Sequence, residues 1–149
     1  MEHEAMVSMK IQPGFHETMD FLTRNQIPKG ILTRNNLAPV RHLIDHTGVT
    51  FDKVVSRDCF SPSKPAPEPL LHICVDTWGL APHSTMMVGD HLDDLRCGRD
   101  AGCVTALLRN PGNAAFEPEA DLVLESLGDL LPLLQNGFQL RNRGQEARL

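Results

Sequence analysis

The sequence predicts an α/β domain in which helices cover both faces of a parallel sheet. Short apolar runs alternate along the chain with segments whose apolar residues recur at helical spacing. The strand-like runs, such as Thr85 to Val88, are continuously apolar, as strands are when both faces of their sheet are buried. The chain has 149 residues, which is enough for one domain of this class.

The predicted elements can be placed by their periodicity and by the residues that end them. Gly79 and Gly102 stand where two helices should stop, and the proline-rich stretch 62–69 is predicted to be a loop. The predicted helices cover about 15–25, 38–46, 70–78, 93–101 and 127–134, the last interrupted by Pro132. The predicted strands cover about 30–33, 51–56, 85–88, 105–108 and 122–124.

Composition and charge argue against several classes of protein. The net charge is -5, whereas binding to nucleic acid favours a basic surface. No apolar run approaches the roughly 18 residues of a membrane span, so neither nucleic acid nor a membrane is an expected partner. The four cysteines form no C-x-x-C pair and are expected to be free thiols. We therefore expect a cytoplasmic protein, or an organellar one if a transit peptide precedes this sequence.

Polar side chains stand where the predicted strands end. Thr33 closes one strand, Lys64 lies in the loop that follows the next, and Gly89-Asp90 ends a third. Asp94 lies four residues after Asp90, near the start of the following helix. Ligands of open parallel sheets bind outside the carboxyl ends of the strands, so we expect these side chains to meet in one crevice.

These residue types fit a site for phosphate and magnesium. A threonine hydroxyl and a lysine ammonium can bind phosphoryl oxygens, and Asp90 offers the hard oxygen that Mg²⁺ prefers. Gly89 allows an unusual backbone conformation, while Asp94 could cap the helix, bind the metal through water, or pair with Lys64. Each residue alone has an ordinary explanation, as a cap, a surface lysine or a turn. Their order at successive strand ends indicates the site.

The order of these motifs resembles that of the haloacid dehalogenase (HAD) superfamily of phosphohydrolases, particularly its phosphoglycolate-phosphatase-like members. Gly30-Ile31-Leu32-Thr33-Arg34-Asn35 is similar to the second motif of that family, a strand ending in Thr or Ser. Ser63-Lys64-Pro65-Ala66-Pro67-Glu68-Pro69 resembles the third motif. Val88-Gly89-Asp90-His91-Leu92-Asp93-Asp94 resembles the fourth, with His91 where Ser or Thr is common. The resemblance covers about residues 11–134.

The resemblance implies a Rossmann-like, HAD-type fold of three layers, with a parallel sheet between two layers of helices. It implies residues 1–10 as the remnant of a helical cap and 11–135 as the core domain. The polar and basic composition of residues 136–149 predicts a flexible tail. The resemblance also implies that Thr33, Arg34, Asn35 and Lys64 bind the phosphate, that Asp90 binds Mg²⁺, and that Gly89 and Asp94 support them. The expected partner is a small phosphorylated metabolite.

The first motif of the family is missing from this sequence. Family members carry D-x-D-x-T on a central strand, where the first Asp is the nucleophile and the second is the general acid and base. No two aspartates separated by one residue occur in the 149 residues. By resemblance, the sheet is therefore incomplete at its centre, between the strands that end at Thr33 and Asp90. A strand-donating partner or a homo-oligomer would cover its two open edges.

Two interpretations remain open at this point. In the first, the full-length form is a magnesium-dependent hydrolase of a small phosphomonoester, and the present chain is truncated and inactive alone. In the second, the chain is a non-catalytic module that binds phosphate, metal or another protein, as a pseudophosphatase would. Both leave this chain without a catalytic residue of its own.

Overall fold

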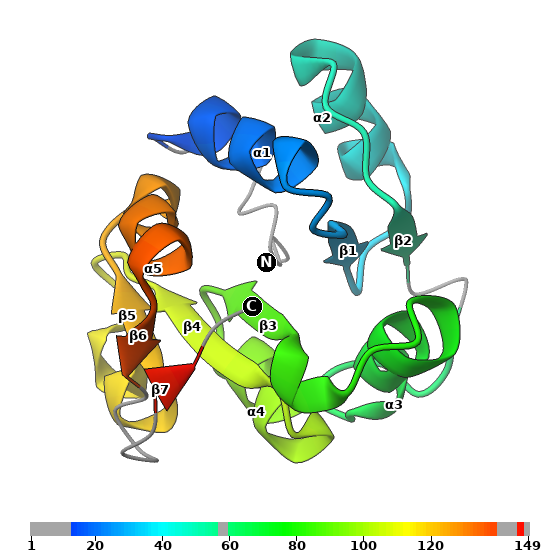
Figure 1. Ribbon diagram of the computed structural model, residues 1–149. Coiled ribbons are helices and arrows are strands. Elements are labelled where there is room, and N and C mark those ends of the chain that lie inside the picture. The colour runs from blue at the N-terminus through cyan, green and yellow to red at the C-terminus, as the bar shows by residue number, and fades with distance from the viewer. Residues whose placement is uncertain (1–12, 57–59, 140–145, 148–149) are drawn as a thin grey trace.

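The computed structural model describes residues 13–56, 60–139 and 146–147 (Figure 1). Five α-helices are present in this part of the chain: α1 (Phe15–Arg24), α2 (Ala38–Thr47), α3 (Glu68–Leu71), α4 (Leu92–Ala101) and α5 (Leu130–Asn136). Seven strands accompany them: β1 (Gly30–Leu32), β2 (Lys53–Val55), β3 (Met86–Gly89), β4 (Val104–Leu108), β5 (Leu122–Leu124), β6 (Phe138–Gln139) and β7 (Glu146–Ala147). Shorter helical turns are η2 (His72–Thr77), η3 (Pro82–Ser84), η4 (Ala114–Glu119) and η5 (Leu127–Asp129).

The five strands of the core are parallel but form two separate sheets. β1 pairs with β2, with Ile31 opposite Val54. β3, β4 and β5 form the second sheet in that order, with Val88 opposite Ala106. β1 and β3 are not hydrogen-bonded to each other. The predicted α/β class with parallel strands is confirmed, and the parallel sheet is divided between β1 and β3.

Helices cover both faces of the strands, because successive residues of a strand point to opposite sides. Ile31 of β1 belongs to a buried cluster with Phe15 and Met19 of α1 and Leu130 of α5. The next residue, Leu32, belongs to a second cluster, whose other members include Leu70, Ile73 and Cys74 from α3 and η2, and Cys97 and Ala101 from α4. The helices therefore form one layer on each side of the strands.

Local sequence sets most of the helix boundaries. Gly102 follows α4 with φ +85°, and Gly79 follows η2 with φ +67°, a region that glycine enters without strain. The predicted helix 70–78 begins two residues earlier and continues from α3 into a π-helical turn over His72–Thr77. The prediction that Pro132 interrupts the last helix is wrong. This residue lies in the first turn of α5, where a backbone N–H would have no helical partner.

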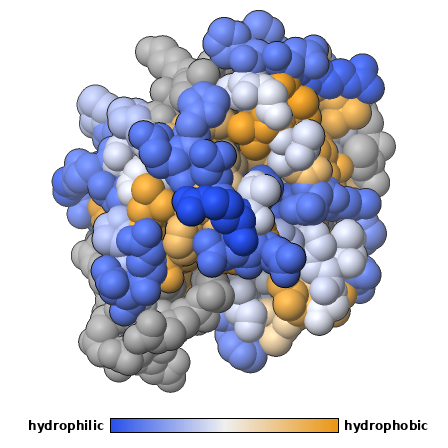
Figure 2. Space-filling model, turned by 45° about the horizontal axis from the view of Figure 1, so that its top comes forward, coloured by the Kyte–Doolittle hydropathy of each residue, from blue (hydrophilic) through white to orange (hydrophobic). Residues whose placement is uncertain are grey.

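One further pair of strands follows α5. β6 and β7 pair antiparallel, with Phe138 opposite Ala147, so a short hairpin lies within the segment expected to be a flexible tail. The predicted cap remnant 1–10 lies outside the described residues. No helix of the described part is long and apolar enough to cross a membrane. The face shown in Figure 2 is mixed, with apolar side chains in separate patches between hydrophilic ones.

Candidate functional site at the strand ends

Lys64 joins the carboxyl ends of the two sheets. Its Nζ donates a hydrogen bond to the carbonyl oxygen of Leu32, the last residue of β1, at 3.2 Å. The same Nζ donates to Oδ1 of Asp94, in the first turn of α4, at 2.6 Å. The structure thus brings together the ends of β1 and β3 and the proline-rich loop, which are far apart in the sequence.

The ion pair between Lys64 and Asp94 is buried. Only 2% of each side chain is exposed. An isolated charge in such an environment is strongly destabilising. The charge of each residue is therefore compensated by the opposite charge of the other. The buried pair fixes the position of the ammonium group at the rim between the sheets.

Thr33 and Asn35 follow β1 and form a tight turn at the same rim. The Thr33 backbone N–H donates to the carbonyl of Val55 in β2, which holds Thr33 in line with the strand. The backbone N–H of Asn35 donates to Thr33 Oγ1 at 2.9 Å. A hydroxyl can accept and donate at once, and the Thr33 hydroxyl proton has no acceptor among the described residues. It remains available to donate to an anion.

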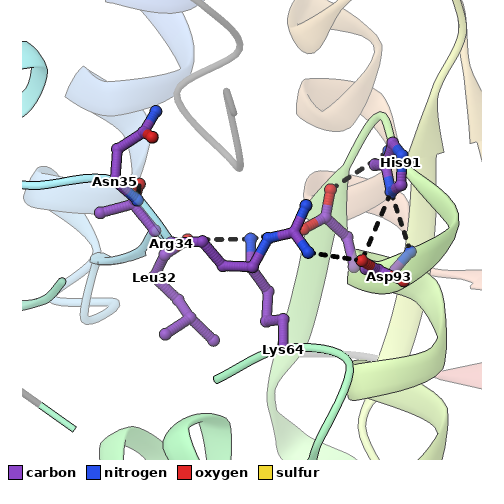
Figure 3. Close-up of polar contacts among 8 residues, drawn as sticks. Leu32, Arg34, Asn35, Lys64, His91 and Asp93 are labelled. Carbon is purple, nitrogen blue, oxygen red and sulfur yellow. Dashed lines mark hydrogen bonds and ion pairs between the residues drawn. The ribbon is translucent and has the colours of Figure 1, made fainter. Parts of the chain in front are cut away.

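Arg34 reaches across the rim to α4. Its guanidinium donates to Asp93 Oδ2 at 2.7 Å, as Figure 3 shows. Both side chains are partly exposed, at 31% and 23%, so solvent screens this pair far more than the buried one. The ion pair links the segment after β1 to the start of α4.

The start of α4 is organised by a capping box, in which two side chains satisfy two backbone N–H groups. His91 Nδ1 accepts from the Asp93 N–H, and Asp94 Oδ2 accepts from the His91 N–H, both at 3.2 Å. Of the three roles considered for Asp94, it takes two, as helix cap and as partner of Lys64. Gly89 allows this packing, since an added Cβ would lie 2.3 Å from Asp94 Oδ2.

Asn113 is a site residue that the sequence did not reveal. It is buried, and its Nδ2 donates at 2.9 Å to the backbone carbonyls of Asp90 and Leu108. It therefore ties the end of β4 to Asp90 at the end of β3. In the sequence, Asn113 is marked only by its position after Asn110-Pro111-Gly112, and these residues predict a loop rather than a site.

The residues at this rim fit Mg²⁺ in donor type but not in donor number. Asp90 would supply a hard oxygen ligand, and Mg²⁺ commonly takes one or two carboxylates with water and phosphate oxygens. Asp93 and Asp94 are engaged by Arg34 and Lys64. No group of three His, Cys, Asp or Glu residues suited to a metal occurs in the described part of the chain. A bound Mg²⁺ would need further oxygens from phosphate, water or another carboxylate.

The cysteines near the site do not replace the missing nucleophile. Cys74, Cys97 and Cys103 are buried free thiols, as predicted, while Cys59 lies outside the described residues. Burial raises the pKa of the Cys97 thiol to about 12. To a smaller extent, the charge of Lys64 lowers this pKa and the charge of Asp94 raises it. Because the thiolate is the nucleophilic form, Cys97 is inert near neutral pH.

Comparison with known proteins places this arrangement in a family. Residues 1–108 match the family model described as haloacid dehalogenase-like hydrolase. An uncharacterized hydrolase of Saccharomyces cerevisiae is 41% identical over 144 residues, covering 91% of this chain and 65% of that protein. The phosphoglycolate phosphatase of Escherichia coli is 30% identical over 127 residues, covering 82% of this chain and 50% of that protein.

Solved structures show the same fold. A predicted phosphoglycolate phosphatase from Haemophilus somnus matches with a TM-score of 0.73 and 22% identity, over 81% of this chain and 56% of that one. The chain thus spans about half to two thirds of the length of the relatives it matches. On the family model, the curated relatives and the fold together, the chain belongs to the haloacid dehalogenase-like hydrolase family.

Proposed function

We propose that this rim binds the phosphate group of a small phosphomonoester together with Mg²⁺, and that the full-length protein hydrolyses the ester. The observation that carries the proposal is the buried Lys64–Asp94 pair. It holds an ammonium group at the end of β1, 3.2 Å from the carbonyl oxygen of Leu32, the residue before Thr33. The phosphoglycolate phosphatase among the relatives supports a phosphorylated substrate.

Each residue has a defined task in this proposal. Thr33 Oγ1 donates to one phosphoryl oxygen. Lys64 and Arg34 neutralise the negative charge of the phosphate. Asp90 contributes a carboxylate oxygen to Mg²⁺, which would supply charge neutralisation at the transferred phosphoryl group. Gly89 and Asp94 hold Asp90 and Lys64 in place.

The present chain is proposed to bind without turnover. Covalent phosphoryl transfer requires a carboxylate in line with the phosphorus atom, and the chain has no Asp-x-Asp motif. Asp94 and Asp93 are unsuitable substitutes because they form ion pairs with Lys64 and Arg34. The missing motif also favours the alternative function, a non-catalytic module that binds a phosphorylated ligand.

Release of inorganic phosphate from p-nitrophenyl phosphate tests the proposal. The chain is assayed with and without Mg²⁺, beside a longer form of the protein that includes an Asp-x-Asp strand. We expect no magnesium-dependent release by the chain and clear release by the longer form. Equal inactivity of both forms would favour the non-catalytic alternative, whereas efficient turnover by the chain alone would overturn the assignment of the missing nucleophile.

A further inference from the structure

Two histidines of α2 lie one helical turn apart. His42 and His46 are separated by four residues within the helix, so their side chains project from the same face of it. Their imidazole rings are stacked, with centroids 6.1 Å apart and planes inclined by only 6°. Two histidines at this spacing on one helix face can bind a single zinc ion.

Both imidazoles are available as ligands. The two residues are exposed to solvent. Neither ring has a hydrogen bond or an ion pair with the described part of the chain, whereas His91 Nδ1 accepts from the Asp93 N–H. Histidine is the commonest metal ligand among protein side chains, and it binds through a neutral ring nitrogen. Both rings of the α2 pair can therefore turn toward a common ion without breaking a hydrogen bond.

The helix that presents the pair is fixed to the core. Val40 and Leu43 are buried on another face of α2 and belong to the main hydrophobic cluster. Gly48 ends the helix in the left-handed region, with φ +74°. In Figure 1, α2 lies at the periphery of the molecule. Ligands on such a helix are held more precisely than ligands on a loop, and the histidine face stays open to solvent.

The ion that suits this pair is a divalent transition metal rather than Mg²⁺. Imidazole nitrogen suits Zn²⁺, Cu²⁺ and Ni²⁺, whereas Mg²⁺ prefers oxygen ligands. Cβ atoms four residues apart on a helix are about 5–6 Å from each other, so one nitrogen of each ring can reach a common ion at about 2.0–2.1 Å. The described residues include no group of three His, Cys, Asp or Glu suited to a metal. Water would therefore fill the remaining positions of the ion.

The surroundings of the pair tolerate a cation. Arg41 and Asp45 of the same helix line, together with His42, an open cavity of about 580 Å³. Their opposite charges compensate each other, so an ion at the pair meets no excess of positive charge from these two neighbours. The cavity also leaves space beside His42 for the water ligands of the ion.

We propose that His42 and His46 together bind one divalent transition-metal ion, with Zn²⁺ as the representative ion. This site differs in position and in ligand chemistry from the proposed magnesium site, because its ligands are imidazole nitrogens of α2 and not the carboxylate of Asp90 after β3. A bound ion would join two successive turns of α2 and would stabilise the folded chain. The proposal does not depend on the proposed phosphatase function.

An NMR titration of the chain with zinc chloride tests the site. We expect the imidazole signals of His42 and His46 to shift together and to saturate with one ion bound to the pair. The signal of His83 is an internal control, because this exposed residue has no histidine four positions away, and it should shift little. Magnesium chloride at the same concentration should leave the signals of the pair unchanged.

Substitutions test whether the two histidines act as a pair. We expect His42→Gln and His46→Gln each to weaken the binding of Zn²⁺ by about tenfold or more, as measured by isothermal titration calorimetry. His83→Gln is the matched control and should bind Zn²⁺ as the native chain does. All three positions are exposed, and circular dichroism should show the same helix content in each variant.

Three results would overturn the proposal. The first is the absence of saturable shifts at His42 and His46 in the native chain, a measurement that requires no variant. The second is an equal shift of the His83 signal, which would indicate weak binding to any exposed histidine. The third is binding that survives the loss of either member of the pair, because the ion would then be held by one histidine or elsewhere.

Discussion

Lys64 and Asp94 form the interaction on which the site most depends. Removal of one partner from a buried ion pair leaves an uncompensated charge, which typically costs about 3–5 kcal/mol. We therefore expect Lys64→Met to lose most of the free energy of unfolding, as measured by urea denaturation. The exposed pair of Arg99 and Glu119 serves as control, and Arg99→Ala should cost about 1 kcal/mol or less. Equal losses in the two variants would contradict the importance of the buried pair.

Cys97 gives a prediction about pH and reactivity. Burial raises the pKa of its thiol to about 12 in the folded chain, from an ordinary value of 9.0. The thiol therefore stays protonated in the folded chain at a pH where the unfolded chain ionises, so its contribution to stability falls as pH rises above about 9. We expect Cys97 to resist iodoacetamide at pH 8 until the chain is unfolded by urea. Rapid modification of this residue in the native chain, mapped by mass spectrometry, would show that the thiol is not buried.

Among the elements, the start of α4 is the most constrained by packing. Gly89 ends β3 in contact with Asp94, and an added Cβ would lie 2.4 Å from its Cγ. We expect Gly89→Ala to lower the free energy of unfolding by about 1–3 kcal/mol through overpacking. Gly112→Ala is the matched control, since its nearest neighbour would be at an ordinary 3.5 Å. If thermal denaturation showed equal stability for the two variants, Gly89 would not be held against α4.

The elements that could be predicted from sequence are those set by local patterns. The apolar runs at β3, β4 and β5 and the glycine after α4 locate those elements within one residue. Asn113 and the pairing of Arg34 with Asp93 could not be found in this way. Both depend on contacts between segments distant in the sequence, 23 residues apart for Asn113 and Asp90 and 59 for Arg34 and Asp93. Periodicity contains no information on such contacts.

For the whole molecule, the division of the sheet between β1 and β3 governs both stability and chemistry. Lys64 joins the end of β1 to Asp94 at the start of α4, yet among the described residues no strand pairs with both edges. The sequence predicted this gap only through the missing Asp-x-Asp motif, because no local pattern marks an absent strand. An apolar groove lined by residues of β1 and β3, among them Leu32 and Val88, is the physical consequence in the described structure.

Binding of inorganic phosphate in the presence of Mg²⁺ tests most directly whether this rim is a phosphate–magnesium site. Isothermal titration calorimetry of the chain should show phosphate binding that requires Mg²⁺. Thr33→Val and Asp90→Asn should each weaken it by about tenfold or more, as expected for loss of a hydrogen bond or ligand to a charged group. Binding of equal strength in the native chain and both variants, or no binding by the native chain, would contradict the proposed site.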